Sequence, residues 1–318
     1  MLNHLHIENY RLFRDLQIDK LGQVNLIAGE NNTGKTALLE ALRILQNKMS
    51  YEIITNVVYL RNDLDKSKPL ESLATLFRKS EPFAAGNNYA FKINALGWGI
   101  FHYKNIIRIH SGIPHSNNLK GDVDFFNYES PFDDSVYVPF RSDLQINMRT
   151  GLWEKIEFED LEKKKIVDML NVISHRKIKQ ISMSDIIPRI QFENGDVEKL
   201  TKSGDGANRL LTIALALVNS KNKMLLIDEF EVGLHHSVQE QLWDIIFKYA
   251  KEWNIQVFVT THSQDTLRAF YYVAEKTPQY KEMANYFTLI RKGNGDVEAI
   301  NYDLEEIETA LMSNLEIR

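Results

Sequence analysis

Apolar and polar positions alternate near the start of the chain, and this pattern predicts short strands followed by a helix. Within residues 1–28, the stretches HLHIENY and VNLIAG alternate or run apolar, so two or three strands are expected there. A glycine-rich segment comes next, and the following stretch, TALLEALRILQNKM, places four leucines at helical spacing. The order of strand, glycine loop and helix is the setting in which a phosphate-binding loop is credible.

Strands and helices alternate again from Pro188 onward. The stretch PRIQFENGDVEKL predicts a hairpin with its turn at Asn194-Gly195. The pattern then predicts a helix in ANRLLTIALALVNS, a strand in KMLLIDEF, an amphipathic helix in HSVQEQLWDIIFKYAKEW, a strand in IQVFVTTHS and a further helix. This alternation implies a mostly parallel sheet.

The middle of the chain follows a different pattern. Antiparallel strands with glycine turns are expected in YAFKINALGWGIFHYKNIIRIHSG, an exposed connection at 112–135, and helix in TGLWEKIEFEDLEKKKIVDMLNVISHRKI. We therefore expect an α/β fold built from both ends of the chain. Its N-terminal lobe is residues 1–58, its C-terminal lobe is residues 188–318, and residues 59–187 form an inserted α+β region.

The composition of the chain mainly excludes certain kinds of site and partner. The chain of 318 residues has no cysteine, which excludes disulfides and cysteine-ligated zinc and fits a reducing cytoplasm. Its apolar runs are too short to cross a bilayer, so no membrane partner is expected. A net charge of −5 argues against a surface coated by nucleic acid, although a local basic patch stays possible. The histidines at 4, 6, 235 and 236 lack the carboxylate or cysteine spacing of a metal site.

A complete phosphate-loop motif lies between the first strands and the first helix. GENNTGKT, from Gly29 to Thr36, matches GxxxxGK[ST] in full. Lys35 is expected to reach the β- and γ-phosphate oxygens of ATP, and the Thr36 hydroxyl is expected to bind Mg²⁺. The predicted nucleotide contacts in this loop are Gly29, Asn31, Asn32, Thr33, Gly34, Lys35, Thr36 and Ala37.

Three polar side chains follow two buried strands, where ligands bind in open α/β sheets. In MLLIDEFE, Asp228 suits Mg²⁺, directly or through a water, and Glu229 suits the general base that orients the attacking water. In VFVTTHS, His262 can contact a γ-phosphate. The alternatives are a helix-capping acid pair and a structural histidine, and the phosphate loop in the same chain favours the catalytic reading.

A second glycine motif, SGDGANRL, opens a helix in the C-terminal half. The order of phosphate loop, serine-glycine signature, Asp-Glu strand end and strand-end histidine resembles the ATPase heads of the ABC type. The resemblance implies that the signature of one subunit completes the nucleotide site of another. Ser203, Gly204 and Gly206 would then act across a homodimer or a higher homo-oligomer.

Within that family the chain resembles the soluble OLD/RecF-like branch, and there the ATPase subunits of bacterial phage-defence systems such as PARIS. The likeness rests on LHIENYRLFRDL, GENNTGKT and IDEFEVGLHHSVQEQLW with VFVTTHSQDTL. SGDGANR departs from transporter ABC domains, where glutamine follows the second glycine. The resemblance implies that Arg11 contacts the nucleotide and that Glu231 to His235 lie at the dimer interface. Gln145 is its candidate for the family's glutamine loop.

Three functions remain open. The first is an ATP-hydrolysing sensor, triggered by phage, that controls a separate effector; the second is a RecF-like ATPase that binds DNA in repair. The third is a scaffold that binds ATP with little turnover. The absence of coiled-coil arms and the acidic charge favour the first. OLD nucleases carry a Toprim domain of on the order of 100 residues, and the stretch after His262 is shorter, so the effector is expected on another chain. The lysine run at 163–165 is read as a solvated helix face or as a partner contact.

Overall fold

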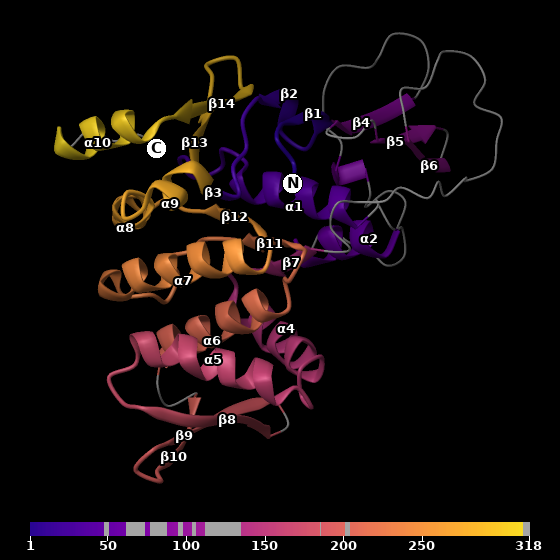
Figure 1. Cartoon of the computed structure of the whole chain (residues 1–318). Helices are drawn as coiled ribbons and strands as arrows, with labels where there is room; N and C mark the ends of the chain where they lie inside the picture. The colour runs from indigo at the N-terminus through magenta and orange to yellow at the C-terminus, as the bar shows by residue number, and fades with distance from the viewer. Residues whose placement is uncertain are drawn as a thin grey trace.

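The structure is a computed structural model that describes residues 1–47, 51–61, 74–76, 88–94, 98–103, 106–111, 135–184, 186–200 and 204–313. Within these residues the centre of the molecule is a six-stranded sheet with the order β14-β13-β3-β12-β11-β7 (Figure 1). Neighbouring strands are parallel, except that β13 and β14 are antiparallel. The strands are β3 (Val24–Ala28), β7 (Ser135–Val138), β11 (Met224–Ile227), β12 (Gln256–Thr260), β13 (Ala284–Arg291) and β14 (Val297–Tyr302).

Every residue of β3, β11 and β12 is buried, because helices cover both faces of the sheet. On one face, residues of β3 and β12 such as Leu26 and Val259 join a hydrophobic core with α6, α7 and α8. On the other face, Ile27 and Phe258 join a second core with α1, α2 and the N-terminal hairpin. The helices are α1 (Lys35–Gln46), α2 (Tyr51–Leu60), α6 (Gly204–Val218), α7 (Gln239–Glu252) and α8 (Gln264–Ala274).

A second sheet combines the start of the chain with its middle. Its order is β2-β1-β4-β5-β6, and the pairs are antiparallel. The strands are β1 (Leu5–Tyr10), β2 (Phe13–Ile18), β4 (Asn88–Asn94), β5 (Trp98–Tyr103) and β6 (Ile106–Ser111). The antiparallel β part of the predicted fold is therefore present, and it lies beside α1 (Figure 1).

The lower part of Figure 1 consists of helices and a small antiparallel sheet below α7. This sheet has the order β10-β9-β8, and its β9–β10 hairpin turns at Asn194 and Gly195, as the sequence predicts. Gly195 has φ 91°, a conformation that suits glycine in a tight turn. The elements are α4 (Ser142–Glu154), α5 (Asp160–Ile173), β8 (Ile178–Ser184), β9 (Ile187–Phe192) and β10 (Val197–Lys199).

The last described elements are α9 (Pro278–Met283), the strands β13 and β14 at one edge of the central sheet, and α10 (Leu304–Met312). Two 3₁₀ turns, η1 (Ala74–Leu76) and η3 (His236–Val238), complete the described elements. In the described part of the chain, no helix has both the length and the apolar character that a membrane crossing requires.

One strand of the central sheet comes from the region expected to be an insert. β7 lies within residues 59–187, yet it pairs in parallel with β11, so that Tyr137 lies opposite Leu226. The segment is only four residues long, which is why the apolar pattern did not predict it. β7 brings its own carboxyl end to the edge where β3 and β11 end.

Candidate nucleotide-binding site

The phosphate loop, Gly29 to Thr36, connects β3 to α1, and its two glycines have backbone conformations that other residues disfavour. Gly29 has φ 147° and Gly34 has φ 102°. A Cβ atom on Gly34 would lie 2.8 Å from the Phe13 ring, and one on Gly29 would lie 2.6 Å from the carbonyl oxygen of Leu289. The fold therefore requires glycine at both positions, and the loop ends at a helix N-terminus, where backbone N–H groups attract phosphate.

Lys35 is folded back onto the loop that it belongs to. Its Nζ donates to the carbonyl oxygens of Gly29 at 2.7 Å and Glu30 at 2.8 Å. Burial lowers the pKa of Lys35, while the carboxylates of Glu229 and Glu231 act in the opposite direction. A phosphate oxygen is a stronger acceptor for an ammonium group than a carbonyl oxygen, so the side chain is already placed for phosphate.

Asp228 and Thr36 meet at the end of β11, as a Mg²⁺ site requires. The Thr36 hydroxyl donates to Asp228 Oδ2 at 3.0 Å, although the two residues are 192 positions apart. Asp228 also accepts from the hydroxyls of Thr260 at 2.7 Å and Tyr137 at 3.3 Å. Burial raises the pKa of Asp228, and these hydrogen bonds oppose that rise. Hydroxyl and carboxylate oxygens are the ligands that Mg²⁺ prefers, so the residues present fit this ion.

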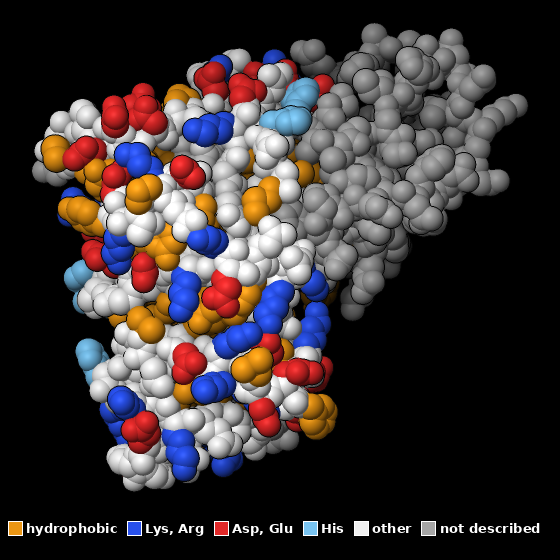
Figure 2. All heavy atoms as spheres, viewed as in Figure 1, with side chains coloured by type: hydrophobic (Ala, Val, Ile, Leu, Met, Phe, Trp, Pro, Cys, Tyr) orange, Lys and Arg blue, Asp and Glu red, His pale blue; other side chains and the backbone are white. Residues whose placement is uncertain are grey.

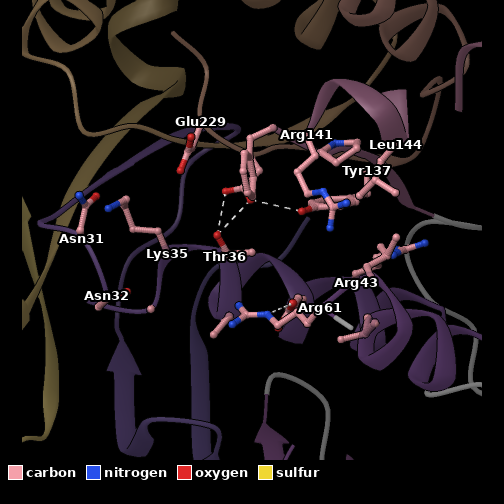
Figure 3. Close-up of a pocket in the computed structure, with 18 of the residues that line it drawn as sticks. Asn31, Asn32, Lys35, Thr36, Arg43, Arg61, Tyr137, Arg141, Leu144 and Glu229 are labelled. Atoms are coloured by element: carbon pink, nitrogen blue, oxygen red, sulfur yellow. Dashed lines mark hydrogen bonds and ion pairs between the residues drawn. The ribbon is translucent and has the colours of Figure 1, made fainter. Parts of the chain in front are cut away.

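Glu229 follows Asp228 and lines the same cavity. Its φ is 48°, which is unusual for a residue with a side chain, and its N–H donates to Thr260 Oγ1 at 2.8 Å. Burial raises the pKa of Glu229, and the negative charge of Asp228 adds to that rise. Figure 3 shows Glu229 on the same side of the cavity as Lys35. A carboxylate held by a strained backbone in such a place suits a general base.

His262 is held by a carboxylate that the sequence did not single out as catalytic. Its Nδ1 lies 2.9 Å from Glu231 Oε1, and the same oxygen accepts the His262 backbone N–H at 2.9 Å. The other oxygen of Glu231 accepts the hydroxyl of Thr261 at 2.8 Å. The contact with Nδ1 sets the tautomer and the orientation of the imidazole ring.

Arg11 lies next to the cavity and is paired with an acid. It has φ 49°, and its Nε lies 2.8 Å from Glu40 Oε2. Arg61 donates to the other oxygen of Glu40 at 2.6 Å, and Glu40, Arg61 and Leu12 line the cavity. Burial raises the pKa of Glu40, while both arginines act to lower it. The contact between Arg11 and a nucleotide stays a prediction.

The second glycine motif lies away from this cavity in the same chain. Ser203 is outside the residues that the structure describes, and Gly204 begins α6. A Cβ atom on Gly206 would lie 2.7 Å from the carbonyl oxygen of Gly233, so α6 packs closely against the segment Glu231 to His235. Among the described residues that line the cavity, none belongs to α6. A role of the motif in a nucleotide site across subunits stays a prediction.

The cavity around the phosphate loop has a volume of about 910 Å³, at the upper end of the range for small-molecule sites. Figure 3 shows that it extends past Thr36 to Tyr137, Arg141 and Arg43. The predicted residues that line it are Asn31, Asn32, Gly34, Lys35, Thr36, Ala37, Asp228 and Glu229. The sequence did not single out Tyr137, Arg43, Arg61 or Arg141, which come from elements whose placement depends on the tertiary fold.

The surface histidines contact side chains that are close to them in the sequence. In the described part of the chain, no cluster of three or more His, Asp or Glu side chains is placed to hold a metal ion. His6 Nε2 lies 2.6 Å from Asp15 Oδ1, and the ring centroids of the neighbours His235 and His236 lie 4.1 Å apart. These contacts are local and structural.

Two known protein families match parts of this chain. Residues 91–268 match the family described as "AAA domain, putative AbiEii toxin, Type IV TA system", and residues 1–157 match the "AAA ATPase domain" family. A Helicobacter pylori protein named ATP/GTP phosphatase is 24% identical over 83% of this chain and 86% of its own length. The DNA replication and repair protein RecF of Rickettsia rickettsii is 24% identical over 86% of this chain and 81% of its own.

Among solved structures, the SMC head domain from Thermotoga maritima superposes with a TM-score of 0.55 at 13% identity. It covers 95% of this chain and 99% of that one. A second structure, an Smc head bound to the C-terminal winged-helix domain of ScpA, has a TM-score of 0.59 at 13% identity and covers 95% and 98%. These likenesses confirm the predicted fold of a P-loop ATPase head, and the narrower OLD-like branch stays a prediction.

Proposed function

The chain belongs to the AAA-domain family matched by residues 91–268, and from this premise we propose that it is an ATPase that uses Mg²⁺ and works as a homo-oligomer. The observation that carries the proposal is the contact between Thr36 and Asp228 at 3.0 Å, with Glu229 directly beside it. Two distant parts of the chain meet there to form the donor set that a Mg²⁺–nucleotide complex requires. We place this activity in the cytoplasm, which suits a chain without cysteine.

Each residue of the site has a distinct task. The phosphate loop binds the β-phosphate through its N–H groups, and Lys35 exchanges its two carbonyl partners for phosphate oxygens. Thr36 and Asp228 hold Mg²⁺, which when bound offsets negative charge on the phosphates. Glu229 orients a water for attack on the γ-phosphate and accepts its proton. His262 is aimed at the γ-phosphate by Glu231.

The position of α6 outside the described lining of the cavity supports a composite site. Because α6 packs against Gly233 in its own chain and does not line the cavity, Gly204 would meet a γ-phosphate only in a partner subunit. The Gly204→Asp and Lys35→Ala proteins should each lack ATPase activity, and their mixture should regain it. A carboxylate at Gly204 would repel the γ-phosphate and block the close approach of the backbone. Gly206 is unsuitable for this test, because a side chain there would disturb the packing of its own chain.

Trapping the nucleotide gives an independent test. Glu229→Gln should keep nucleotide and Mg²⁺ binding but lower turnover by about 10²–10⁴-fold, because the base is lost. Size-exclusion chromatography with light scattering should then show an ATP-dependent dimer. The Lys35→Ala protein, which should not bind ATP, is the matched control. If Glu229→Gln stays monomeric with ATP and the mixed variants regain no activity, the second motif does not act across subunits. A wild-type protein that binds ATP but barely hydrolyses it would favour the scaffold.

For the biological role, we propose that the ATPase senses phage infection and controls a separate effector, either a Toprim-type nuclease or a toxin. The family description, which includes a toxin of a toxin–antitoxin system, supports a role of this kind. The test is co-purification of the chain with the product of the neighbouring gene, followed by infection of cells that carry the Glu229→Gln variant. Equal phage resistance in cells with wild-type and variant protein would contradict the sensor role.

A second candidate function is a RecF-like ATPase that binds DNA in repair. The RecF relatives, at 24% identity over 86% of this chain, favour it. Gel-shift assays with duplex DNA at two salt concentrations separate the candidates, since a DNA clamp loses affinity steeply as salt rises. Tight, ATP-dependent DNA binding would support the RecF-like role over the sensor role.

A further inference from the structure

The segment that follows β7 reaches the nucleotide cavity from the side opposite the phosphate loop. The N–H of Asp228 donates to the carbonyl oxygen of Val138 at 2.9 Å, so the end of β7 lies next to the proposed Mg²⁺ ligand. The next three residues, Pro139, Phe140 and Arg141, all line the cavity. The phosphate loop would hold the β-phosphate and Asp228 would hold Mg²⁺, so we expect the γ-phosphate at the end of the site that this segment faces.

Gln145, the candidate glutamine-loop residue of the sequence analysis, does not line this cavity. Its side chain turns back on its own segment, and its Nε2 donates to the carbonyl oxygens of Pro139 at 2.9 Å and Phe140 at 3.2 Å. The residue is only 5% exposed. The amide donors of Gln145 are thus engaged by the backbone, and its burial leaves little surface for a ligand.

The backbone before Arg141 is held from a second side as well. Arg209 Nη1 donates to the carbonyl oxygen of Pro139 at 2.7 Å, so this oxygen accepts from both Arg209 and Gln145. Arg141 then takes an extended conformation, with φ −69° and ψ 122°, as the N-cap of α4. Because the backbone before Arg141 is held by two hydrogen bonds and α4 begins directly after it, the backbone of Arg141 is fixed at the cavity wall.

Arg141 brings a positive charge to this part of the cavity. Figure 3 shows its side chain beside Tyr137, whose hydroxyl lies 3.3 Å from Asp228 Oδ2. Guanidinium groups bind phosphate oxygens through two parallel hydrogen bonds, and phosphoryl-transfer sites use such groups to offset charge on the γ-phosphate. The place and the chemistry of Arg141 match that task.

We propose that Arg141 contacts the γ-phosphate within its own subunit and that Gln145 is a positioning residue that holds the backbone before it. This inference rests on the proposed function and reverses the part expected of Gln145. The site would then distinguish nucleoside triphosphate from diphosphate through an arginine in the same chain, in addition to the signature motif of a partner.

The test compares the affinities of ADP·Mg²⁺ and AMP-PNP·Mg²⁺ by isothermal titration calorimetry. Arg141→Ala should weaken AMP-PNP by about 10- to 100-fold, the range expected for a hydrogen bond to a charged group, while the affinity for ADP stays within about twofold. Arg141→Lys keeps the charge but loses the paired geometry, so its loss should be smaller and again confined to AMP-PNP. Gln145→Met should shift the same ratio in the same direction, because it frees the backbone before Arg141. Arg268→Ala, an exposed arginine on α8, is the matched control and should change neither affinity.

The outcomes are distinguishable. Equal losses for both nucleotides in Arg141→Ala, or no loss, would overturn the proposal. A selective loss in Gln145→Met with an unchanged Arg141→Ala would overturn it too, because Gln145 would then be the γ-phosphate contact. A wild-type protein that binds neither nucleotide would instead refute the proposed ATPase function. Thermal unfolding of each variant verifies that the fold is kept, and Arg141→Lys decides the question if Arg141→Ala does not fold.

Discussion

Arg209 is the buried cation that connects three parts of the site, and its removal is the strongest single test of how the site is held. The residue lies on α6 and is 2% exposed. Its Nη1 donates to the carbonyl oxygen of Pro139 at 2.7 Å, and its Nη2 donates to those of Asp228 at 2.7 Å and Glu229 at 3.0 Å. Burial lowers its pKa to about 10, with Asp228 opposing the shift, so the side chain is still charged at neutral pH.

The expected cost of Arg209→Met follows from the acceptors that it leaves behind. The carbonyl oxygen of Pro139 would keep Gln145 Nε2 as a donor, and that of Glu229 would keep the N–H of Val232, so only that of Asp228 would lose its donor. A buried acceptor without a partner costs about 1–3 kcal/mol, so a net loss of about 1–3 kcal/mol in the free energy of unfolding is expected, a sizeable part of the 5–15 kcal/mol typical of a domain. The backbone of Glu229 also loses a partner, so turnover should fall more than ADP affinity.

Urea unfolding, followed by circular dichroism, measures this cost as a shift of the midpoint at unchanged slope. The matched control is Arg176→Met, because Arg176 also donates to several oxygen atoms, here the carboxylates of Asp196 and Glu198, but its side chain is 43% exposed. That exposed ion-pair cluster should contribute little to stability, because solvent and salt screen it. If Arg209→Met costs as little as Arg176→Met, the carbonyl group of Asp228 finds another partner, and Arg209 does not hold the site together.

Three further predictions concern other contacts of the site and its surroundings. Glu231→Gln should lower kcat about 10-fold or more with little change in ADP affinity, because His262 loses the partner that orients its ring; equal kcat in steady-state assays would remove Glu231 from the mechanism. Because the pKa of Glu40 is raised in the folded protein, this carboxyl group stabilises the fold fully at any pH below its ordinary pKa of 4.5. That contribution is lost as the pH rises through the raised pKa. The urea midpoint of wild type should therefore fall relative to that of Glu40→Gln between pH 5 and pH 8. An unchanged or rising relative midpoint would contradict the raised pKa of Glu40. Charge reversal of the lysines at 163–165 should leave the basal ATPase rate unchanged but weaken partner or DNA binding in pull-down and gel-shift assays; a large loss of hydrolysis with an intact fold would show that α5 takes part in the chemistry.

The sequence predicts those parts of the site whose residues form a continuous local pattern. The phosphate loop follows β3 and precedes α1 because strand, glycine loop and helix are adjacent in the chain, and Asp228 ends a strand whose residues are all apolar. β7 could not be predicted in the same way. It is four residues long, and its pairing with β11 is fixed by packing between segments that are distant in the chain.

The sequence does not single out Arg209 and predicts a different part for Gln145, and the role of both residues depends on where tertiary packing directs their side chains. Arg209 lies in α6, whose second half is mostly apolar, and its guanidinium group donates to backbone carbonyl groups of two other segments. Gln145 has the residue type of a nucleotide contact, but its rotamer directs it to the backbone of Pro139. Side-chain direction of this kind is set by tertiary packing, which hydrophobic periodicity does not encode.

The pairing of Thr36 with Asp228 has a consequence for how the protein is made. The two residues are separated by 192 positions, so the ribosome delivers the phosphate loop long before its partner strand. β3 is also flanked in the sheet by β12 and β13, which come later still. Contacts of such high sequence separation slow folding, because a long loop must close before any of them contributes. The apolar faces of β3 and α1 therefore stay uncovered until the last third of the chain has been synthesised. During that time we expect the chain to need protection from aggregation.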